Sequence, residues 1–456
     1  MKYGILSLLQ TLVLFVMIIL TKRVLLSLGV AGLLGAVLYC PQHFLSTWLS
    51  HLESNINSEF MGNLCVMMAL FGIFIIMMER SNAAREFALW LSKYAKKRWQ
   101  SLLLTELLGI IIFIDDALNN VAVGTSMRRL TDHYLVPRTL LGYITISTSA
   151  PVCILVPIST WAVFNGGLMM ENGVSRGDVV STFAGTIPYM FYGWTTILVM
   201  TLMVLGVFPL LGSTRRQQKR AYQDHVIIAA EDSRNGEAVV AEVFSEADCA
   251  KKHDPFLFLV PLCVLIAGTL LFDNNVKVGC FLGLLASALM MRFRCKLAWA
   301  EILQCGMEGV VSMVPLLTQL TLSTTVTSLN IALGMPDFIL KTVTPILSGK
   351  FLPFAVFLCL GLYSSFGGGF WEMCILFMPV VMPLSLQLGV DPYLTAAAVV
   401  SAAAAGCSLY VCGDTEALVS SVMGTTPASQ SAAVLPYTLV SCGLSALLFL
   451  LFGFLA

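Results

Sequence analysis

Charged side chains are scarce in this chain of 456 residues. Asp, Glu, Lys and Arg make up 11% of it, whereas a soluble domain typically has about 25%; hydrophobic residues make up 57%, and the mean hydropathy is +0.85. Continuous apolar runs cover 4–20, 61–78, 187–211, 256–272 and 432–455. Each is long enough to cross a bilayer as a helix, and their continuity excludes the alternating strands of a β-barrel. The composition predicts an all-α polytopic membrane protein, and we expect the first run to be retained as a helix.

Several motifs of enzymes and pumps are also missing. No GxxxxGK[ST] loop occurs, which argues against ATP-driven pumping, and none of the five His lies in an HExxH motif. The GxGD signature of intramembrane aspartyl proteases fails because Val411 occupies its first glycine position. The thirteen Cys form no CxxC pair and fall mostly in apolar runs, which is typical of small buried hydrophobic residues. We therefore expect neither an enzyme nor a bound cofactor.

Basic residues are absent from 41–60 and, apart from Arg176, from 165–186. Of the 26 Lys and Arg, 21 lie in five segments: 22–23, 79–100, 127–138, 212–255 and 292–296. The positive-inside rule places these segments in the cytoplasm. We expect the chain to lie in the inner membrane of a bacterial cell, surrounded by lipid.

Residues 101–126 join two basic segments but are too apolar for a surface loop. A helix of that length spans the membrane only once, which would place one basic segment outside. The simplest solution is a re-entrant hairpin that turns at 115–120 and returns to the cytoplasm. Irregular backbone at that depth must be buried in protein or line a watery cavity, so the hairpin implies a site.

The next segment, 139–164, is interrupted by Pro151 and Pro157. Proline removes a backbone donor and disturbs a helix, and transporters use such discontinuous helices to bring free backbone groups to a substrate. The alternative is a kinked helix stabilised by its own Ser and Thr hydroxyls, and the sequence leaves the two interpretations equal.

The second half repeats this theme. We expect LTQLTLSTTVTS (317–328) to form a polar turn and SSFGGG (364–369) to interrupt a helix, and the 43 residues from Asp116 to Ser159 recur between corresponding positions of these two segments. The pattern predicts inverted repeats, as in many secondary transporters. The expected parts are an N-terminal transmembrane repeat (1–211), a cytoplasmic linker loop (212–255) and a C-terminal transmembrane repeat (256–456).

Asp115 and Asp116 are the sharpest candidates for transport chemistry. A carboxylate at a membrane helix centre costs about 2.5–3.5 kcal/mol, so its presence indicates function. Two adjacent carboxylates in a low-dielectric site cannot easily both ionise, so one can hold a proton and exchange it for a metal cation. Asn119 and Asn120 offer neutral oxygens suited to Na+. The alternative is a capped helix N-terminus at the water interface.

Further polar residues lie at the interruptions of the apolar segments. The remaining candidates for binding the ion or substrate are Ser147, Thr148, Ser159, Thr160, Ser364, Ser365, Glu372, Asp414 and Thr415. Among all candidates we expect Asp116, Asn119 and Asp414 to ligate the cation. Asp414 could instead cap a helix, and Glu372 could instead pair with a Lys at the interface. Glu106 is expected only to extend its carboxylate toward the membrane surface.

Three segments resemble the NhaC-type Na+/H+ antiporter family: FIDDALNNVAVGTSMRRLTDHY (113–134), STSAPVCILVPISTW (147–161) and GDTEALVSS (413–421). The resemblance implies a multi-pass secondary antiporter with re-entrant hairpins and broken helices. Members of the family exchange Na+ for H+, and some relatives carry organic acids. The chain departs from the family pattern at Ile146, where an Asp is usual, and at 407–408, where Asp-His is common.

Together these features favour a Na+/H+ antiporter that works by alternating access with membrane-embedded carboxylates. The alternative is a Na+- or H+-coupled carrier or exchanger of a small organic acid or amino acid; a channel would need the same hairpins without alternating access. We expect Na+ and H+ as the transported ions and no nucleic-acid partner, and we leave a homodimer open.

Overall fold

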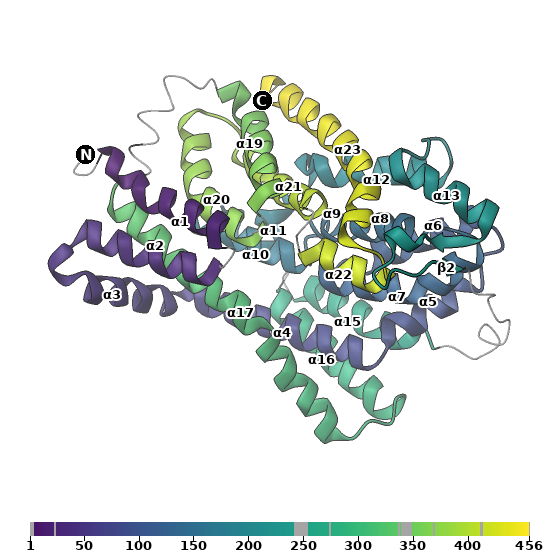
Figure 1. Ribbon diagram of the computed structural model, residues 1–456. Helices are drawn as coiled ribbons and strands as arrows, with labels where there is room; N and C mark the ends of the chain where they lie inside the picture. The colour runs from purple at the N-terminus through teal and green to yellow at the C-terminus, as the bar shows by residue number, and fades with distance from the viewer. Residues whose placement is uncertain are drawn as a thin grey trace.

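The computed structural model describes residues 4–21, 24–240, 254–272, 275–335, 338, 349–367, 370–410 and 414–455. These residues are almost wholly helical (Figure 1). The described strands are β1 (Val226–Ile228) and β2 (Val239–Val240), which pair antiparallel with Val226 opposite Val240. They follow α13 (Gly212–Asp224) within the segment expected to be a cytoplasmic linker. The division into two repeats and a linker stays a prediction.

The first part of the chain forms α1 (Leu9–Thr21), α2 (Val24–Tyr39), α3 (Phe44–Ile56), α4 (Glu59–Arg80), α5 (Ala83–Ser92), α6 (Arg98–Ile111), α7 (Asp116–His133), α8 (Arg138–Thr148), α9 (Ala150–Cys153), α10 (Thr160–Glu171), α11 (Val179–Ala184) and α12 (Phe191–Val204). The second part forms α15 (Phe256–Leu271), α16 (Val276–Phe293), α17 (Trp299–Ala332), α19 (Leu352–Gly367), α20 (Phe370–Gln387), α21 (Pro392–Leu409), α22 (Asp414–Met423) and α23 (Pro427–Leu455). Short 3-10 turns are η1 (Gly4–Leu8), η2 (Pro41–His43), η3 (Ile187–Tyr189), η4 (Ala230–Asp232) and η5 (Gly349–Phe351).

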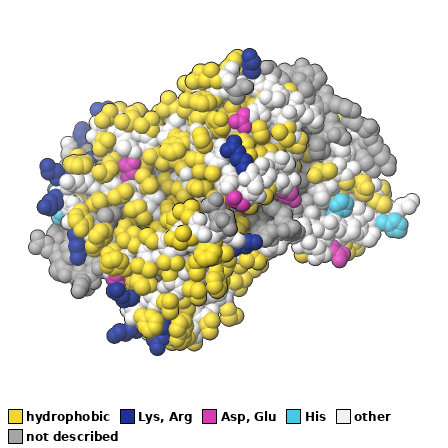
Figure 2. All heavy atoms as spheres, turned by 180° about the vertical axis from the view of Figure 1, so that it is seen from behind, with side chains coloured by type: hydrophobic (Ala, Val, Ile, Leu, Met, Phe, Trp, Pro, Cys, Tyr) yellow, Lys and Arg dark blue, Asp and Glu magenta, His cyan; other side chains and the backbone are white. Residues whose placement is uncertain are grey.

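The apolar segments suit a membrane, although many of them are broken. Within the described ranges, α21 and α23 are each long and apolar enough to cross a bilayer, and the pair Val179–Tyr189 and Phe191–Val204, bent by 56°, makes a third candidate. The breaks shorten the other apolar stretches. Figure 2 shows a broad hydrophobic face with the Lys and Arg side chains mostly at its margins, as a lipid-facing surface requires.

The alanine-rich helix α21 lies at the centre of the second half. It packs against α12, α19, α20 and α23, and its residues from Leu394 to Ser408 are all buried. Small side chains permit this close approach: a Cβ added to Gly406 would lie 2.5 Å from the Ser364 Cβ of α19. The end of α21 is thereby fixed beside the last turn of α19.

The helices α6 and α7 fold back on each other. The Tyr134 hydroxyl, just after α7, donates to the Ala95 carbonyl before α6 at 3.1 Å. At the same end, the Gln218 side chain accepts from Arg98 at 2.6 Å and donates to the Leu135 carbonyl at 2.8 Å. Both outer ends therefore lie together, as the charge pattern predicted for 101–126. That the hairpin enters the membrane from the cytoplasm stays a prediction.

The polar turn expected at 317–328 is wrong. α17 runs unbroken for 34 residues (Figure 1), and its hydroxyls bond to carbonyls one turn earlier in the same helix. Thr321 donates to Leu317 at 2.8 Å, and Thr325 donates to Thr321 at 2.8 Å. Because Ser and Thr can satisfy themselves in this way, a run of hydroxyls does not by itself break a helix.

Candidate functional site

The Asp pair lies at the tip of the α6–α7 hairpin, where α7 begins. Asp115 is the N-cap: its extended backbone leads into the helix, and its carboxylate accepts from the Leu118 amide at 2.9 Å. Asp116 is the first helical residue. Both residues are only partly buried. A helix N-terminus carries partial positive charge, which favours anionic groups in this place.

The Asn119 side chain links the start of α7 to the end of α6 and to the end of α8. Its side-chain nitrogen lies within hydrogen-bond distance of three carbonyls: Gly109 at 2.6 Å and Ile112 at 2.8 Å in the hairpin, and Thr148 at 3.0 Å at the end of α8. These carbonyls lie at helix ends, where backbone carbonyls have no partner within the helix. Asn119 is fully buried, so its amide is occupied in holding the break, and the expected ligand role falls on its oxygen alone.

Asn120 presents a different arrangement one residue later. Its side chain is 1% exposed, and its Oδ1 has no hydrogen-bond partner among the described residues. It lies four residues after Asp116, on the same face of α7. A buried amide oxygen without a partner, beside a carboxylate, is a suitable ligand for a hard cation.

The proline-rich segment between α8 and α10 is discontinuous rather than a single kinked helix, which decides between the two interpretations that the sequence left equal. Ser159 is the N-cap of α10: its hydroxyl donates to the Cys153 carbonyl at 2.6 Å and accepts from the Ala162 amide at 3.0 Å. These bonds close the gap between α9 and α10. The Ser159 side chain is thus committed to the cap, and Ser147 and Thr148 lie buried at the end of α8 on the other side of the break.

The tip of the α6–α7 hairpin and the start of α10 are in direct contact. The Thr160 amide donates to the Ile114 carbonyl at 2.9 Å, and the Thr160 hydroxyl donates to Asp115 Oδ2 at 3.4 Å. The Trp161 indole nitrogen donates to Asp116 Oδ1 at 3.2 Å. The N-termini of α7 and α10 therefore meet at the two carboxylates, and each carboxylate has its own donor from α10.

Elements of the second half reach this crossing. The Trp371 ring, in the first turn of α20, packs against Trp161 at 4.9 Å and Phe164 at 4.6 Å between ring centroids. Cys407 at the end of α21 and Thr415 in the first turn of α22 are both buried. The sequence pointed to Trp161 and to positions 407–408 only through the family resemblance, and it did not point to Trp371.

The two serines in the last turn of α19 point elsewhere. Ser364 donates to the carbonyls of Gly361 at 3.0 Å and Ala402 at 3.2 Å, and Ser365 donates to Gly361 at 2.7 Å. Within the described residues, neither hydroxyl bonds to the Asp pair. The side chains of Glu372 and Asp414 lie outside the part of the chain that is described, as do 368–369 and 411–413.

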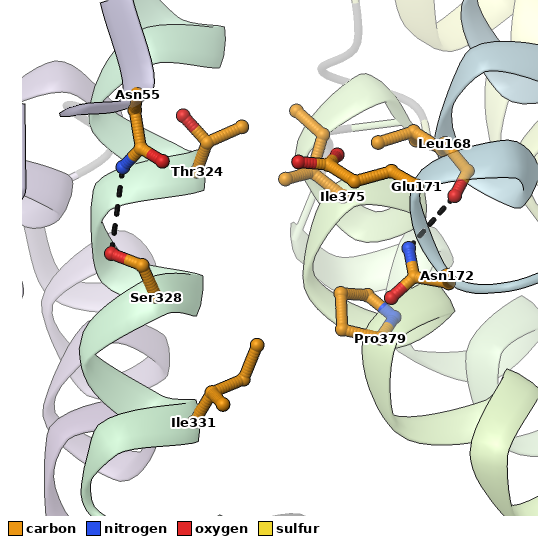
Figure 3. A pocket seen from close by; sticks show the side chains of 9 residues that line it. All are labelled: Asn55, Leu168, Glu171, Asn172, Thr324, Ser328, Ile331, Ile375 and Pro379. Atoms are coloured by element: carbon orange, nitrogen blue, oxygen red, sulfur yellow. Dashed lines mark hydrogen bonds between the residues drawn. The ribbon is translucent and has the colours of Figure 1, made fainter. Parts of the chain in front are cut away.

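A cavity of about 90 Å³, lined by both polar and apolar side chains, lies at the other end of α10 (Figure 3). The Glu171 and Asn172 side chains form one wall. Asn55, Thr324 and Ser328 form the facing wall, where the Asn55 amide donates to Ser328 at 3.4 Å. The hydroxyls of α17 thus line a cavity between helices far apart in sequence.

Comparison with known proteins identifies the family. Residues 152–454 match the Na+/H+ antiporter family. The chain belongs to this family. The match begins after Asp115 and Asp116, so the role of that pair rests on the geometry above. An uncharacterised Haemophilus influenzae protein is 23% identical over 440 residues, which cover 90% of this chain and 82% of its own.

Two solved transporters share the fold of this antiporter-family chain. The Alcanivorax borkumensis YdaH transporter, described as having an unusual topology, aligns with a TM-score of 0.58 at 12% identity, covering 90% of this chain and 88% of its own. Neisseria gonorrhoeae MtrF, described with a class of antimetabolite efflux pumps, aligns with a TM-score of 0.55 at 13% identity, covering 90% and 85%. Family and fold are those of a membrane-embedded secondary transporter rather than an enzyme.

Proposed function

We propose that this transporter exchanges Na+ for H+ across the inner membrane of a bacterial cell. The observation that carries the proposal is the Asp115–Asp116 pair at the crossing of two broken segments. No Lys or Arg occurs in 99–127, in 139–175 or after Lys350, so the broken segments contain no basic side chain that could neutralise the pair. The partner left for these carboxylates is a proton or a small cation.

Competition for one site couples the two ions. With the proton bound, Asp116 is neutral, and the pair has one negative charge fewer to attract Na+. When Na+ arrives, the carboxylate, the Asn120 oxygen and water provide the oxygen ligands that hard cations prefer, and the proton leaves. The hydrogen bonds from Thr160 and Trp161 hold both carboxylates in place in either state. Alternating access then carries one ion in each direction.

The cavity at the end of α10 supports an approach from the outer side. At about 1.5 Å per residue, the 12 residues of α10 place Glu171 roughly 17 Å from Thr160. The loop after Glu171 lies in the segment that is poor in basic residues, which the positive-inside rule places outside. Glu171 and the amides of the cavity would attract a cation there before it reaches the Asp pair.

Coupled transport of a small organic acid is the second candidate. The structural neighbour MtrF is described as belonging to antimetabolite efflux pumps, and the amide ends of α7 and α10 could hold a carboxylate. The absence of basic residues at the crossing weighs against it, because an organic anion would lie beside Asp115 and Asp116 without compensation.

Transport by purified protein in proteoliposomes tests the proposal. With a pH gradient imposed, we expect external Na+ to collapse the gradient, whereas choline of equal osmolarity and ionic strength should not. The same liposomes are then supplied with small mono- and dicarboxylates. Gradient collapse that needs an organic anion, with no response to Na+ alone, would replace the antiporter assignment by the second candidate.

A further inference from the structure

Exposed basic and aromatic side chains lie together where the start of α6 meets α13. This basic–aromatic surface comprises Lys96, Lys97, Trp99, Arg215, Lys219 and Tyr222, which are all exposed. No Asp or Glu occurs in 87–105 or in 179–223, and the Lys and Arg of the surface form no ion pair with another described residue. The surface therefore carries positive charge that nothing in these segments compensates.

Contacts of Arg98 join the two helices. Its Nη2 donates to the Gln218 side chain at 2.6 Å, and its guanidinium carbon lies 5.9 Å from the centroid of the Tyr222 ring. Arg215, Lys219 and Tyr222 follow one another at helical spacing, which places all three on one face of α13. Because Tyr222 borders Arg98, that face borders the start of α6. The positive charges of the two helices thus belong to one surface.

An exposed apolar stripe of α6 leads directly to this surface. Leu107 and Ile110 are exposed and lie on the same side of α6 as Trp99, which is 46% exposed. In a membrane protein such a stripe faces lipid, and a Trp at its end is typical of the level of the headgroups. The lipids that cover the stripe therefore bring their headgroups to Trp99 and to the neighbouring Lys96 and Lys97.

Glu106 does not place a negative charge on this stripe. It is 3% exposed, and its carboxylate accepts a hydrogen bond from the Thr201 hydroxyl of α12. It therefore does not extend toward the membrane surface, and the sequence-based expectation for this residue is wrong.

Anionic phospholipids fit both parts of this arrangement. Each Lys or Arg near a membrane surface strengthens the attraction to such lipids on the order of fivefold, and the acyl chains cover the apolar stripe. Phosphatidylcholine offers the same chains, but its own ammonium group compensates its phosphate. A free phosphate lacks the chains. The positive-inside rule places this surface in the cytoplasm, where the membrane leaflet is rich in anionic lipid.

We propose that the basic–aromatic surface binds the headgroups of anionic phospholipids in the cytoplasmic leaflet. The phosphates lie against Arg215 and Lys219, and Trp99 lies between the headgroups and the acyl chains. Bound lipid also holds α13 in place, and the Gln218 side chain of α13 donates to the Leu135 carbonyl after α7 at 2.8 Å. The lipid thus stabilises the outer ends of the hairpin that carries the Asp pair, whichever ion or substrate is transported.

Thermal unfolding of the purified protein in detergent tests the proposal. Phosphatidylglycerol added to the micelles should raise the unfolding midpoint by about 3 °C or more above the midpoint with an equal amount of phosphatidylcholine, as expected for a ligand of the folded state. The double variant Arg215→Gln, Lys219→Gln should lose most of this difference and keep the midpoint measured with phosphatidylcholine.

Two adjacent residues supply a matched pair of single variants. Lys219→Gln and Arg220→Gln each remove one positive charge from α13, but Arg220 is already paired with Glu231 at 2.6 Å. Only Lys219→Gln should reduce the difference between the two lipids. Equal losses in both variants would overturn the proposal, because they would show a dependence on net charge rather than on this surface.

Other outcomes would overturn it as well. These are equal midpoints with the two lipids, or an undiminished difference in the double variant. Glycerol phosphate should leave the midpoint unchanged, and a rise as large as that with phosphatidylglycerol would make a free anion the occupant instead of a lipid. If the double variant does not fold, Lys96→Gln with Lys97→Gln tests the same surface from α6 and must lose the difference. None of these measurements involves transport, so their result is independent of the proposed Na+/H+ exchange.

Discussion

The carboxylate of Asp116 is the group on which the proposed exchange depends most. Asp116→Asn keeps the side-chain shape and an oxygen that accepts from the Trp161 indole, but an amide cannot take up and release a proton. We expect Na+/H+ exchange in proteoliposomes to fall by about two orders of magnitude or more, while the elution profile and thermal unfolding in detergent match the wild type. Normal exchange by a well-folded Asp116→Asn variant would remove Asp116 from the site.

Asn119 should matter for stability rather than for ion affinity. Asn119→Ala leaves the carbonyls of Gly109, Ile112 and Thr148 without their shared donor, and unsatisfied buried groups cost about 1–3 kcal/mol. We expect a lower thermal unfolding midpoint in detergent. Thr125→Ala, on the exposed side of the same helix, is the control and should leave the midpoint nearly unchanged. Equal midpoints for the two variants would contradict the fastening role.

Residue types could be predicted at the site, but their partners could not. The adjacent Asp115 and Asp116 stood out because carboxylates are costly in apolar segments. Ser364 and Ser365 were also expected to bind the ion, because they lie where an apolar segment was expected to be interrupted. Their hydroxyls instead bond to carbonyls of α19 and α21. Which carbonyl a hydroxyl meets depends on how helices pack, and a single sequence does not contain that information. Trp371 was missed for the same reason.

At the scale of elements, the α6–α7 hairpin makes a firm prediction about topology. In a background without cysteine, Lys96→Cys and His133→Cys, at the two outer ends, should both react with a membrane-impermeant thiol reagent from the cytoplasmic side only. Gln42→Cys, in the segment without basic residues, should react only from outside. Labelling of Lys96→Cys and His133→Cys from opposite sides would show that 101–126 crosses the membrane once.

Close packing between α6 and α8 gives a second test at this scale. A Cβ added to Gly109 would overlap the Thr148 side chain, whereas one added to Gly361 in α19 would meet nothing within 4 Å. Overpacking typically costs about 1–3 kcal/mol, so Gly109→Ala should lower the thermal midpoint and the exchange rate. Gly361→Ala should do neither. If Gly109→Ala changed neither the thermal midpoint nor the exchange rate, α6 would be able to shift away from α8 without disturbing the site.

Elements were predictable where charge or proline marked them. Two basic segments flanking an apolar one predicted the hairpin, and Pro151 and Pro157 marked the break before α10. The failure at α17 came from treating hydroxyls as helix breakers, although Thr321 and Thr325 are satisfied by their own helix. Without a proline or glycine in 317–328, nothing there forces the backbone out of a helix.

At the scale of the whole molecule, the site and the cavity depend on contacts that sequence cannot show. Trp161 meets Trp371 across 210 residues, and the cavity joins α3 and α17 to the C-terminal end of α10. Both features connect segments of different halves. Alternating access by rocking of one bundle against another would move such contacts, so the two walls of the cavity are the place to detect motion.

Cross-linking across that cavity tests whether the walls move during transport. Glu171→Cys and Ser328→Cys face each other from α10 and α17 (Figure 3), and a short bifunctional thiol reagent joining them in a cysteine-free background should stop exchange, with reduction of a cleavable linker restoring it. Asn55→Cys with Ser328→Cys is the matched control, because these two residues share one wall and a hydrogen bond at 3.4 Å. Joining them should leave exchange intact. Full activity with the Glu171–Ser328 cross-link in place would mean that α10 and α17 keep a fixed distance, and the moving boundary would then have to lie elsewhere in the fold.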